Sequence, residues 1–262
     1  MLETHETVIE RIEVVRGKGE SLAELATEAS ARLSADIDSI GGVIAATFSN
    51  PDRFPSLAVR VAAKLGLPTS IPAFDLQMAC SASPYAVYLA GKAAADTGKK
   101  ILVVDGDVQS RLVDAADHAT GAIFSDAATA SLVSAGDGEP SRFDFLSRLD
   151  DALTCAESGP IHMDGMRVFT FVATEVVGFL RSFGSDFDAF APHQANPYMI
   201  RQLAKSLGLA DKLLAIAESE KNPGSCSVPM AIAENSASGR VLVAGFGAGL
   251  SAAAGVVTVR RQ

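Results

Sequence analysis

The sequence lacks paired cysteines, a secretory leader and an excess of positive charge. Its three cysteines, Cys80, Cys155 and Cys226, are odd in number and widely spaced. They therefore form neither a disulfide framework nor a CxxC metal pair, and we expect no metal site. The first residues, Met1 to Glu13, are rich in acids and contain no long apolar core, unlike a signal peptide. These absences predict a reducing, cytoplasmic location.

Basic residues are too few for a general nucleic-acid binder. The formal net charge is −9, whereas such a protein needs a basic face to neutralise phosphates. An anionic partner such as coenzyme A or an acidic carrier protein would need a local basic patch. Long polar or Pro/Ser-rich tracts are also missing, so a flexible linker is not expected.

One long uncharged run, 241–259, could span a bilayer by length alone. Glycines divide it, and its ends are β-branched. This pattern predicts two buried strands joined by a glycine turn, and no membrane span. The dividing glycines are Gly245, Gly247, Gly249 and Gly255.

Apolar β-rich runs alternate with helical segments, which predicts an α/β fold. The clearest helix, 165–183, places Met166, Phe169, Val172, Val176 and Phe179 on one face. Strands are expected in the segments IERIEVV, GGVIAATFS, PAFDLQM, KILVVDGD, TASLVS, FDAFAP, LLAIAE, RVLVAGF and AGVVTV, and other helices over 21–33, 55–65, 81–97, 196–207 and 227–235.

A Gly/Asp/Pro turn cluster at Asp137–Pro140 is the best position for a seam between two halves. We therefore expect an N-terminal half, 1–140, that carries a nucleophilic cysteine, and a C-terminal half, 141–262, that carries a histidine and an asparagine.

Cys80 follows a predicted buried strand and opens a Ser/Ala-rich helix. A thiol at a helix N-terminus is a candidate nucleophile, because the helix dipole favours the thiolate and lowers its pKa. Taken alone, a buried structural cysteine is the more common reading.

Two further polar residues lie in predicted loops of the second half. His193 stands between a strand and a helix, where strand-end loops commonly line a ligand crevice. Asn222 begins an Asn-Pro-Gly sequence, which is also ordinary turn chemistry. Each has a structural explanation when read alone.

Together with the glycine loop GFGAGLSAAAG, these sites form an ordered set. The fragments FDLQMACSASPYA, DGMRVFTFVATEV, APHQANPYMIRQLAKSLG, NPGSCSVPMAIAE and GFGAGLSAA resemble, in order and spacing, the segments of ketoacyl synthase III and its thiolase-superfamily relatives. The likeness runs from about Leu22 to the C-terminus. HQAN followed by N-x-x-x-x-SVP is quite specific to this group.

The resemblance implies a five-layered αβαβα fold of two similar halves, a homodimer, and no cofactor beyond acyl-CoA or acyl-carrier-protein substrates. Cys80 matches the acylated nucleophile, whereas His193 and Asn222 match the pair facing a malonyl thioester. The backbone N–H groups of Cys80 and Ala248 match an oxyanion hole. Further matches are acyl-pocket or dimer residues (Phe54, Met78, Ser83 and Leu250) and carrier-docking residues (Arg201 and Lys205).

The chain also departs from the family pattern. It has no tryptophan, so the indole that stacks on the adenine of coenzyme A in the housekeeping enzymes is missing. The usual first strand and the segment after it are shortened or replaced by Val8–Gly19. The GDGAG pattern reads SDAAT at 125–129, a loop glycine is replaced by Ala248, and Tyr198 occupies a position expected to hold arginine.

Three functions remain open from sequence. The leading one is decarboxylative condensation in fatty-acid or specialised lipid or polyketide biosynthesis. The others are acyl transfer from Cys80 without decarboxylation and a subunit of a heterodimeric ketosynthase. The complete set of Cys80, His193 and Asn222 favours the first.

Overall fold

The computed structural model describes residues 1–114, 116–117, 120–156, 159–217 and 220–261. Its main sheet has eight strands in the order β3-β2-β4-β5-β1-β10-β9-β8. Their bounds are β1 Leu2–Arg16, β2 Ile40–Ala46, β3 Ala73–Leu76, β4 Lys100–Asp107, β5 Ala127–Ser147, β8 Ala189–Pro192, β9 Gly239–Gly247 and β10 Ser251–Val259.

Helices separate and cover the strands. They are α1 Leu22–Arg32, α2 Leu57–Lys64, α3 Ala82–Thr97, α4 Gly165–Phe171, α5 Val177–Arg181, α6 Pro197–Leu207 and α7 Ser227–Glu234. A two-stranded ribbon, β6 Leu153–Cys155 with β7 Ile161–Met163, lies apart from the main sheet.

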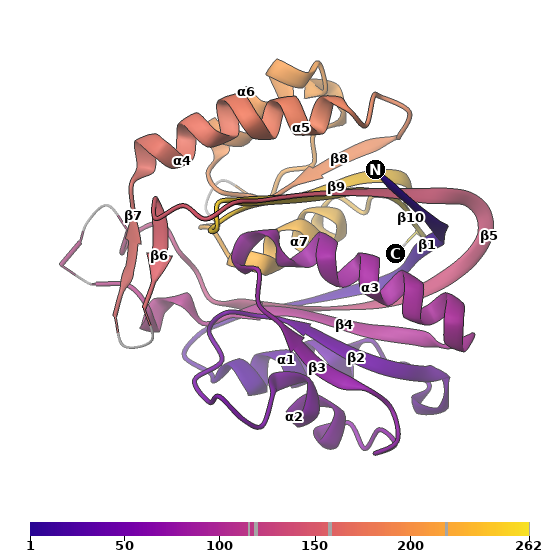
Figure 1. The fold of residues 1–262 in the computed structure, drawn as a ribbon. Coiled ribbons are helices and arrows are strands. Elements are labelled where there is room, and N and C mark those ends of the chain that lie inside the picture. The colour runs from indigo at the N-terminus through magenta and orange to yellow at the C-terminus, as the bar shows by residue number, and fades with distance from the viewer. Residues whose placement is uncertain (115, 118–119, 157–158, 218–219, 262) are drawn as a thin grey trace.

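The elements stack in five layers, as the sequence resemblance implied. Figure 1 shows α1 and α2 below one part of the sheet, α3 and α7 in the middle, and α4 to α6 above the other part. Three apolar clusters fill the spaces between these layers. The fold is therefore αβαβα.

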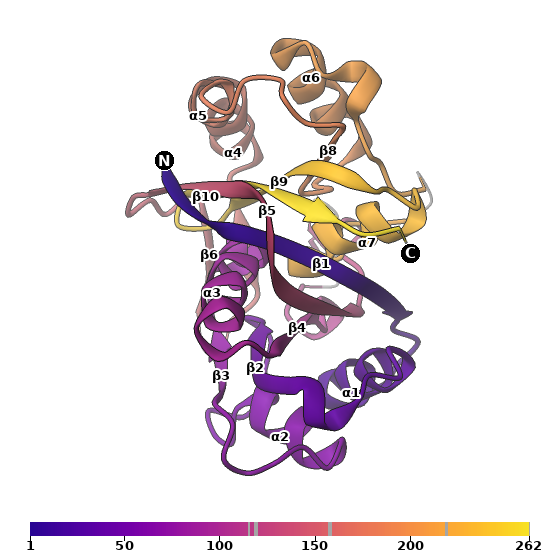
Figure 2. The same ribbon diagram turned by 90° about the vertical axis from the view of Figure 1, so that its right-hand side faces the viewer.

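Two long strands connect the two parts of the sheet. β1 pairs with β5 along most of its length and also pairs in parallel with β10. β5 is 21 residues long and curves from the layer of β4 to that of β10 (Figures 1 and 2). The predicted seam, Asp137–Pro140, thus lies inside β5, and the division into two halves stays a prediction.

Local sequence signals explain the helix ends. Ser21 and Glu24 form a capping box at the start of α1. Asn196 caps α6, with Pro197 in the first turn, and Gly208 ends that helix in the left-handed conformation. These helices lie within a few residues of their predicted bounds.

The uncharged run 241–259 forms β9 and β10, which are antiparallel neighbours joined by a short glycine turn. This confirms the predicted pair of strands. In the described part of the chain, no helix is long and apolar enough to cross a membrane.

Two local predictions were wrong. The strand predicted to begin at Leu213 is absent over Leu213–Ala217, where the chain forms only an isolated bridge to Phe190. The Gln194 side chain binds the Leu214 carbonyl and the Ile216 N–H, which in a strand would bind the backbone of a neighbouring strand. The last residue of that predicted strand, 218, lies outside the described residues.

In the long helix, Met166 is exposed. A π-helical turn over Val172–Val176 widens this helix, so a regular 3.6-residue period cannot describe its buried face.

Candidate active site

Cys80 lies in a single 3₁₀ turn, Ala79–Ser81, between β3 and α3. The predicted strand-to-helix position is therefore confirmed. Ala79 has a φ of 44°, an uncommon conformation for a residue with a side chain. Such backbone strain is often found at functional sites, where the surrounding structure maintains it.

Two glycines of β9 allow that strand to pass close to Cys80. A Cβ atom at Gly245 would lie 2.8 Å from the Cys80 carbonyl oxygen, and one at Gly247 would lie 3.0 Å from the Cys80 Cβ. Larger residues would separate the strand from the thiol, so the close approach explains both glycines.

Hydrogen bonds connect the loop after β9 with the turn that carries Cys80. The Ser81 and Ser251 hydroxyls are 2.8 Å apart, and Ser251 Oγ donates to the Ala248 carbonyl over 2.6 Å. These contacts fix the backbone of Ala248 relative to Cys80. This arrangement supports the expectation that the backbone N–H groups of Cys80 and Ala248 stabilise the same oxyanion.

The predicted low pKa of the Cys80 thiol is wrong. Burial, and secondarily the negative charge of Asp107, raises its pKa to about 12. A helix terminus contributes at most ~2 kcal/mol, or about 1.5 pKa units, whereas full burial can shift a pKa by about 3 to 5 units. Desolvation therefore outweighs the helix dipole, and the resting thiol is protonated.

His193 follows β8 and is 3% exposed. Burial lowers the pKa of its imidazole to about 4, while a backbone hydrogen bond at Gly224 acts in the opposite direction. The ring is therefore neutral at physiological pH. Its edge-to-face contact with Phe246, the neighbour of Gly247, connects it with the strand that passes Cys80.

Asn222 is held in one orientation. Its side-chain oxygen accepts from the Gly224 N–H over 2.9 Å, so its NH2 group turns the other way, 3.5 Å from His193 Nε2. The two predicted residues thus meet directly. The turn Gly224–Cys226 that follows packs against the turn of Cys80, which brings all three residues to one end of the sheet.

Sequence reasoning missed the partner of His193. The Ser227 hydroxyl lies 2.7 Å from Nδ1, and both side chains are buried. When Ser227 donates this bond, the imidazole proton lies on Nε2, facing Asn222. Ser227 belongs to the quoted SVP motif, and the only available signal was its position at the start of a helix.

Asp107, at the end of β4, was also missed. Its buried carboxylate accepts from the hydroxyls of Thr47, Ser49 and Ser225 and from the Phe48 N–H. Burial raises the pKa of Asp107 to about 6, although these hydrogen bonds oppose the rise. The carboxylate joins the loop after β2 to the loop after Asn222. A charge within an apolar strand was the signal that could have identified it.

The segment after β5 supports the glycine loop from the other side. The backbone N–H groups of Arg148 and Asp150 donate to the carbonyls of Leu250 and Gly249, over 3.0 and 2.7 Å. Hydrogen bonds of this kind hold the loop against a second segment of the chain.

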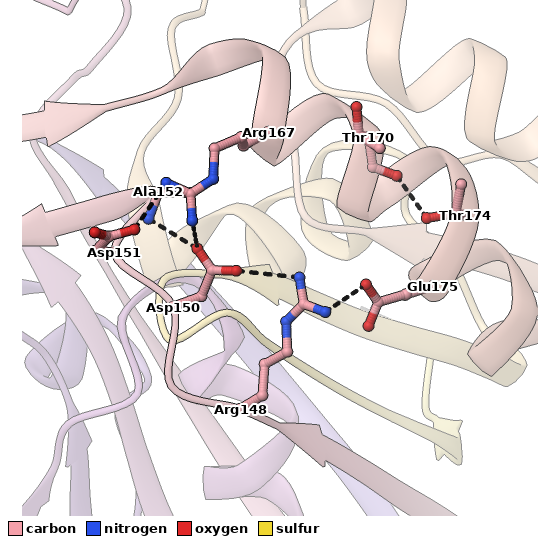
Figure 3. A network of polar contacts seen from close by, with 8 residues as sticks. All are labelled: Arg148, Asp150, Asp151, Ala152, Arg167, Thr170, Thr174 and Glu175. Atoms are coloured by element: carbon pink, nitrogen blue, oxygen red, sulfur yellow. Dashed lines mark hydrogen bonds and ion pairs between the residues drawn. The ribbon is translucent and has the colours of Figure 1, made fainter.

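Ion pairs fix that second segment in turn. Asp150 lies between Arg148 and Arg167, at 3.1 and 2.6 Å, and Asp151 pairs with Arg167 while Glu175 pairs with Arg148 (Figure 3). Single exposed pairs contribute little, but a connected network restricts several side chains at once.

The predicted acyl-pocket residues lie in different environments. Leu250 belongs to the cluster beneath α4 to α6, and Met78 packs against the cluster around α3. Ser83 is buried, with 3% of its surface exposed. Phe54 is 85% exposed in the single chain.

A cleft of about 300 Å³ opens beside Asn222 and Gln194. Its walls include the apolar side chains of Ile123 and Ile200, and Arg201 also lines it. Lys205 is exposed one helical turn further along α6. The cleft therefore borders both α6 and Asn222, whereas Cys80 and His193 are not among the residues that line it.

Comparison with known proteins identifies the same family as the resemblance of the sequence motifs. The chain matches the family model of 3-oxoacyl-[acyl-carrier-protein] synthase III over residues 74–148 and its C-terminal model over 184–259. The beta-ketoacyl-[acyl-carrier-protein] synthase III of Neisseria gonorrhoeae is 31% identical over 90% of this chain and 84% of its own length. That of Shewanella oneidensis is 33% identical over 91% of this chain and 82% of its own.

The fold is likewise that of solved structures in this group. A 3-oxoacyl-(acyl-carrier protein) synthase from Burkholderia xenovorans superposes with a TM-score of 0.87 and 23% identity, covering 98% of this chain and 95% of its own. These findings define a thiolase-type condensing-enzyme fold. The chain belongs to the 3-oxoacyl-[acyl-carrier-protein] synthase III family.

Proposed function

We propose that this protein is a β-ketoacyl-[acyl-carrier-protein] synthase III-type acyltransferase that works in two half-reactions. In the first, Cys80 Sγ attacks an acyl thioester, and the thiol proton leaves with the released carrier thiol. In the second, a malonyl thioester loses CO2, and its carbanion attacks the acyl-Cys80 thioester; a β-ketoacyl thioester is released, and Cys80 leaves as a thiolate that takes up a proton from water. Acyl-carrier protein and acyl-CoA are the expected substrates.

The convergence of His193 Nε2 and Asn222 NH2 carries this proposal. Decarboxylation creates an enolate oxygen, which neutral donors stabilise in a site with little water. The lowered pKa of His193 keeps its ring neutral, and Ser227 can hold the tautomer with hydrogen on Nε2. Plain acyl transfer has no need of this pair of donors.

The first half-reaction needs help to ionise the thiol, since the pKa of Cys80 is raised. The charge that develops on the substrate carbonyl is then stabilised by the backbone N–H groups of Cys80 and Ala248. Each such donor is typically worth ~3 kcal/mol. We assign these two groups to the oxyanion hole.

Arg201 and Lys205 give the carrier a basic docking face on an otherwise acidic molecule. The cleft lined by Arg201 also borders Asn222, and its apolar residues Ile123 and Ile200 suit the uncharged arm of a thioester. No separate cofactor enters the mechanism. We further propose that the protein acts in the cytoplasm, in fatty-acid or a specialised lipid or polyketide pathway.

Intact-mass analysis tests the function. The protein is incubated with panels of acyl-CoAs and acyl-carrier proteins, and a malonyl thioester is then added. We expect an acyl mass that appears with the preferred donor and disappears on addition of the malonyl thioester, with release of CO2. An acyl mass that persists would contradict the condensing function.

The raised pKa of Cys80 predicts the pH dependence of its alkylation. Below a pKa of about 12, the thiolate fraction grows about tenfold per pH unit. Iodoacetamide should therefore modify Cys80 at a rate that climbs without a plateau from pH 7 to 10. Peptide mapping in a Cys155→Ser variant, which removes the exposed cysteine, measures this rate. A plateau below pH 9 would restore the low-pKa interpretation.

We also propose a homodimer with Phe54 at its interface. Phe54 is largely exposed in the single chain, and β3 is an edge strand whose Phe74 is 42% exposed. Phe54→Asp should shift the dimer towards monomer in sedimentation at micromolar concentration, because it places a charge in an apolar contact. Ile37→Asp, at another exposed apolar position, should leave the dimer intact. A monomeric wild-type protein would contradict this proposal.

A further inference from the structure

Gln109 is a fully buried side chain just beyond the end of β4. Its Nε2 donates to two backbone carbonyls, those of Asn222 and Ser125, each over 3.0 Å. One amide of the N-terminal part of the chain therefore holds the residue that supplies the NH2 donor of the C-terminal part.

The two carbonyls fix the orientation of the Gln109 amide. Only the NH2 end can face two acceptors, so Oε1 must point away, and in the described part of the chain it has no hydrogen-bond partner. A buried acceptor without a partner is unfavourable. The two hydrogen bonds from Gln109 Nε2 offset the cost of burying Oε1 without a partner.

The Asn222 backbone lies outside the helices and strands of the fold. It forms an isolated bridge with Phe124, in which Asn222 N–H donates to Ile123 and Ser125 N–H donates to the Asn222 carbonyl. Neither segment is part of the main sheet. Gln109 connects this bridge with the segment directly after β4, while Asp107 of that strand binds the following loop at Ser225.

We infer that Gln109 is a positioning residue for the second half-reaction. It holds the Asn222 backbone so that the side-chain NH2 meets the enolate oxygen beside His193 Nε2. This inference rests on the proposed function of Asn222. Cys80 lies on a different segment and makes no hydrogen bond to Gln109 among those described, so acyl loading should not depend on this residue.

Gln109→Met tests the inference, because methionine has a similar length and shape but no N–H group. We expect consumption of a malonyl thioester by the acyl-enzyme to fall roughly 10- to 100-fold, since small displacements of a positioned group can cost about 10²-fold. The rate of Cys80 acylation should stay within about twofold of wild type. Gln202→Met, the same exchange at an exposed position of α6, should change neither rate when both thioesters are supplied as coenzyme A esters, so that carrier docking to α6 does not enter the comparison.

A double-mutant cycle separates positioning from a general loss of structure. If Gln109 acts through Asn222, then Gln109→Met should add less than about twofold to the loss already caused by Asn222→Ala. A merely structural role predicts losses that multiply and an acylation rate that falls as well.

Should Gln109→Met not fold, Gln109→Asn provides the second variant. It keeps the amide but withdraws it from the carbonyls by one methylene, and the same selective loss is expected. Two results would overturn this inference and leave the proposed function intact. In both, the wild-type protein condenses normally; in the first, the losses caused by Gln109→Met and Asn222→Ala multiply in the double mutant, and in the second, the Gln109 variants condense at the wild-type rate. A wild-type protein that never consumes a malonyl thioester would overturn the proposed function and this inference together.

Discussion

Replacing Cys80 with serine is expected to lower turnover by about 10³-fold or more, because loss of a nucleophile that acts with its neighbours removes most of the catalytic advantage. A hydroxyl without a positioned base is a far weaker nucleophile than a sulfur. The acylation rate, measured by intact mass, should fall with turnover. The variant should keep the close approach of Gly245 and Gly247 to position 80, because serine is no larger than cysteine.

Cys155→Ser is the matched control, because Cys155 is exposed on β6, apart from the main sheet. It should load and condense like the wild type. Cys226 is buried, and its Sγ lies 3.3 and 3.1 Å from the carbonyl oxygens of Asp105 and Ala127, so we expect it to remain unmodified. Peptide mapping that placed the acyl group on Cys155 or Cys226 would refute the assignment of Cys80.

The second large effect is expected from Asn222→Ala, which should separate the two half-reactions. Acyl loading should persist, because Asn222 contributes nothing to the attack by Cys80. Decarboxylation of the malonyl thioester should fall on the order of 10²-fold or more, since one enolate donor is lost from a site with little water. Single-turnover assays of the preloaded enzyme measure this step.

Asn222→Asp refines the experiment. Aspartate keeps the oxygen that accepts from Gly224 N–H but loses the NH2 group, so the loop is preserved while the donor is removed. His193→Ala should also lose decarboxylation, and slower loading in the same variant would indicate that the neutral imidazole assists ionisation of Cys80. Wild-type rates of condensation in Asn222→Ala would favour acyl transfer without decarboxylation.

The sequence by itself determined the α/β class, and the order of its motifs singled out Cys80, His193 and Asn222, whose roles stay predictions carried by the resemblance to a family. Their signals are local: a strand running into a helix at Cys80, the HQAN motif at His193, and Asn222 before SVP. The glycine-split run 241–259 likewise predicted β9 and β10, because glycine and β-branched residues act on the backbone where they stand. The αβαβα architecture came from the resemblance to a family.

Only the tertiary structure decided how these residues behave. The pKa of Cys80 depends on how deeply it is buried and on Asp107, which is 27 positions away in the chain. Ser227 and Gln109 acquire their roles from side-chain contacts with His193 and Asn222. Burial and long-range hydrogen bonds are properties of the packed chain, and no local pattern in the sequence specifies them.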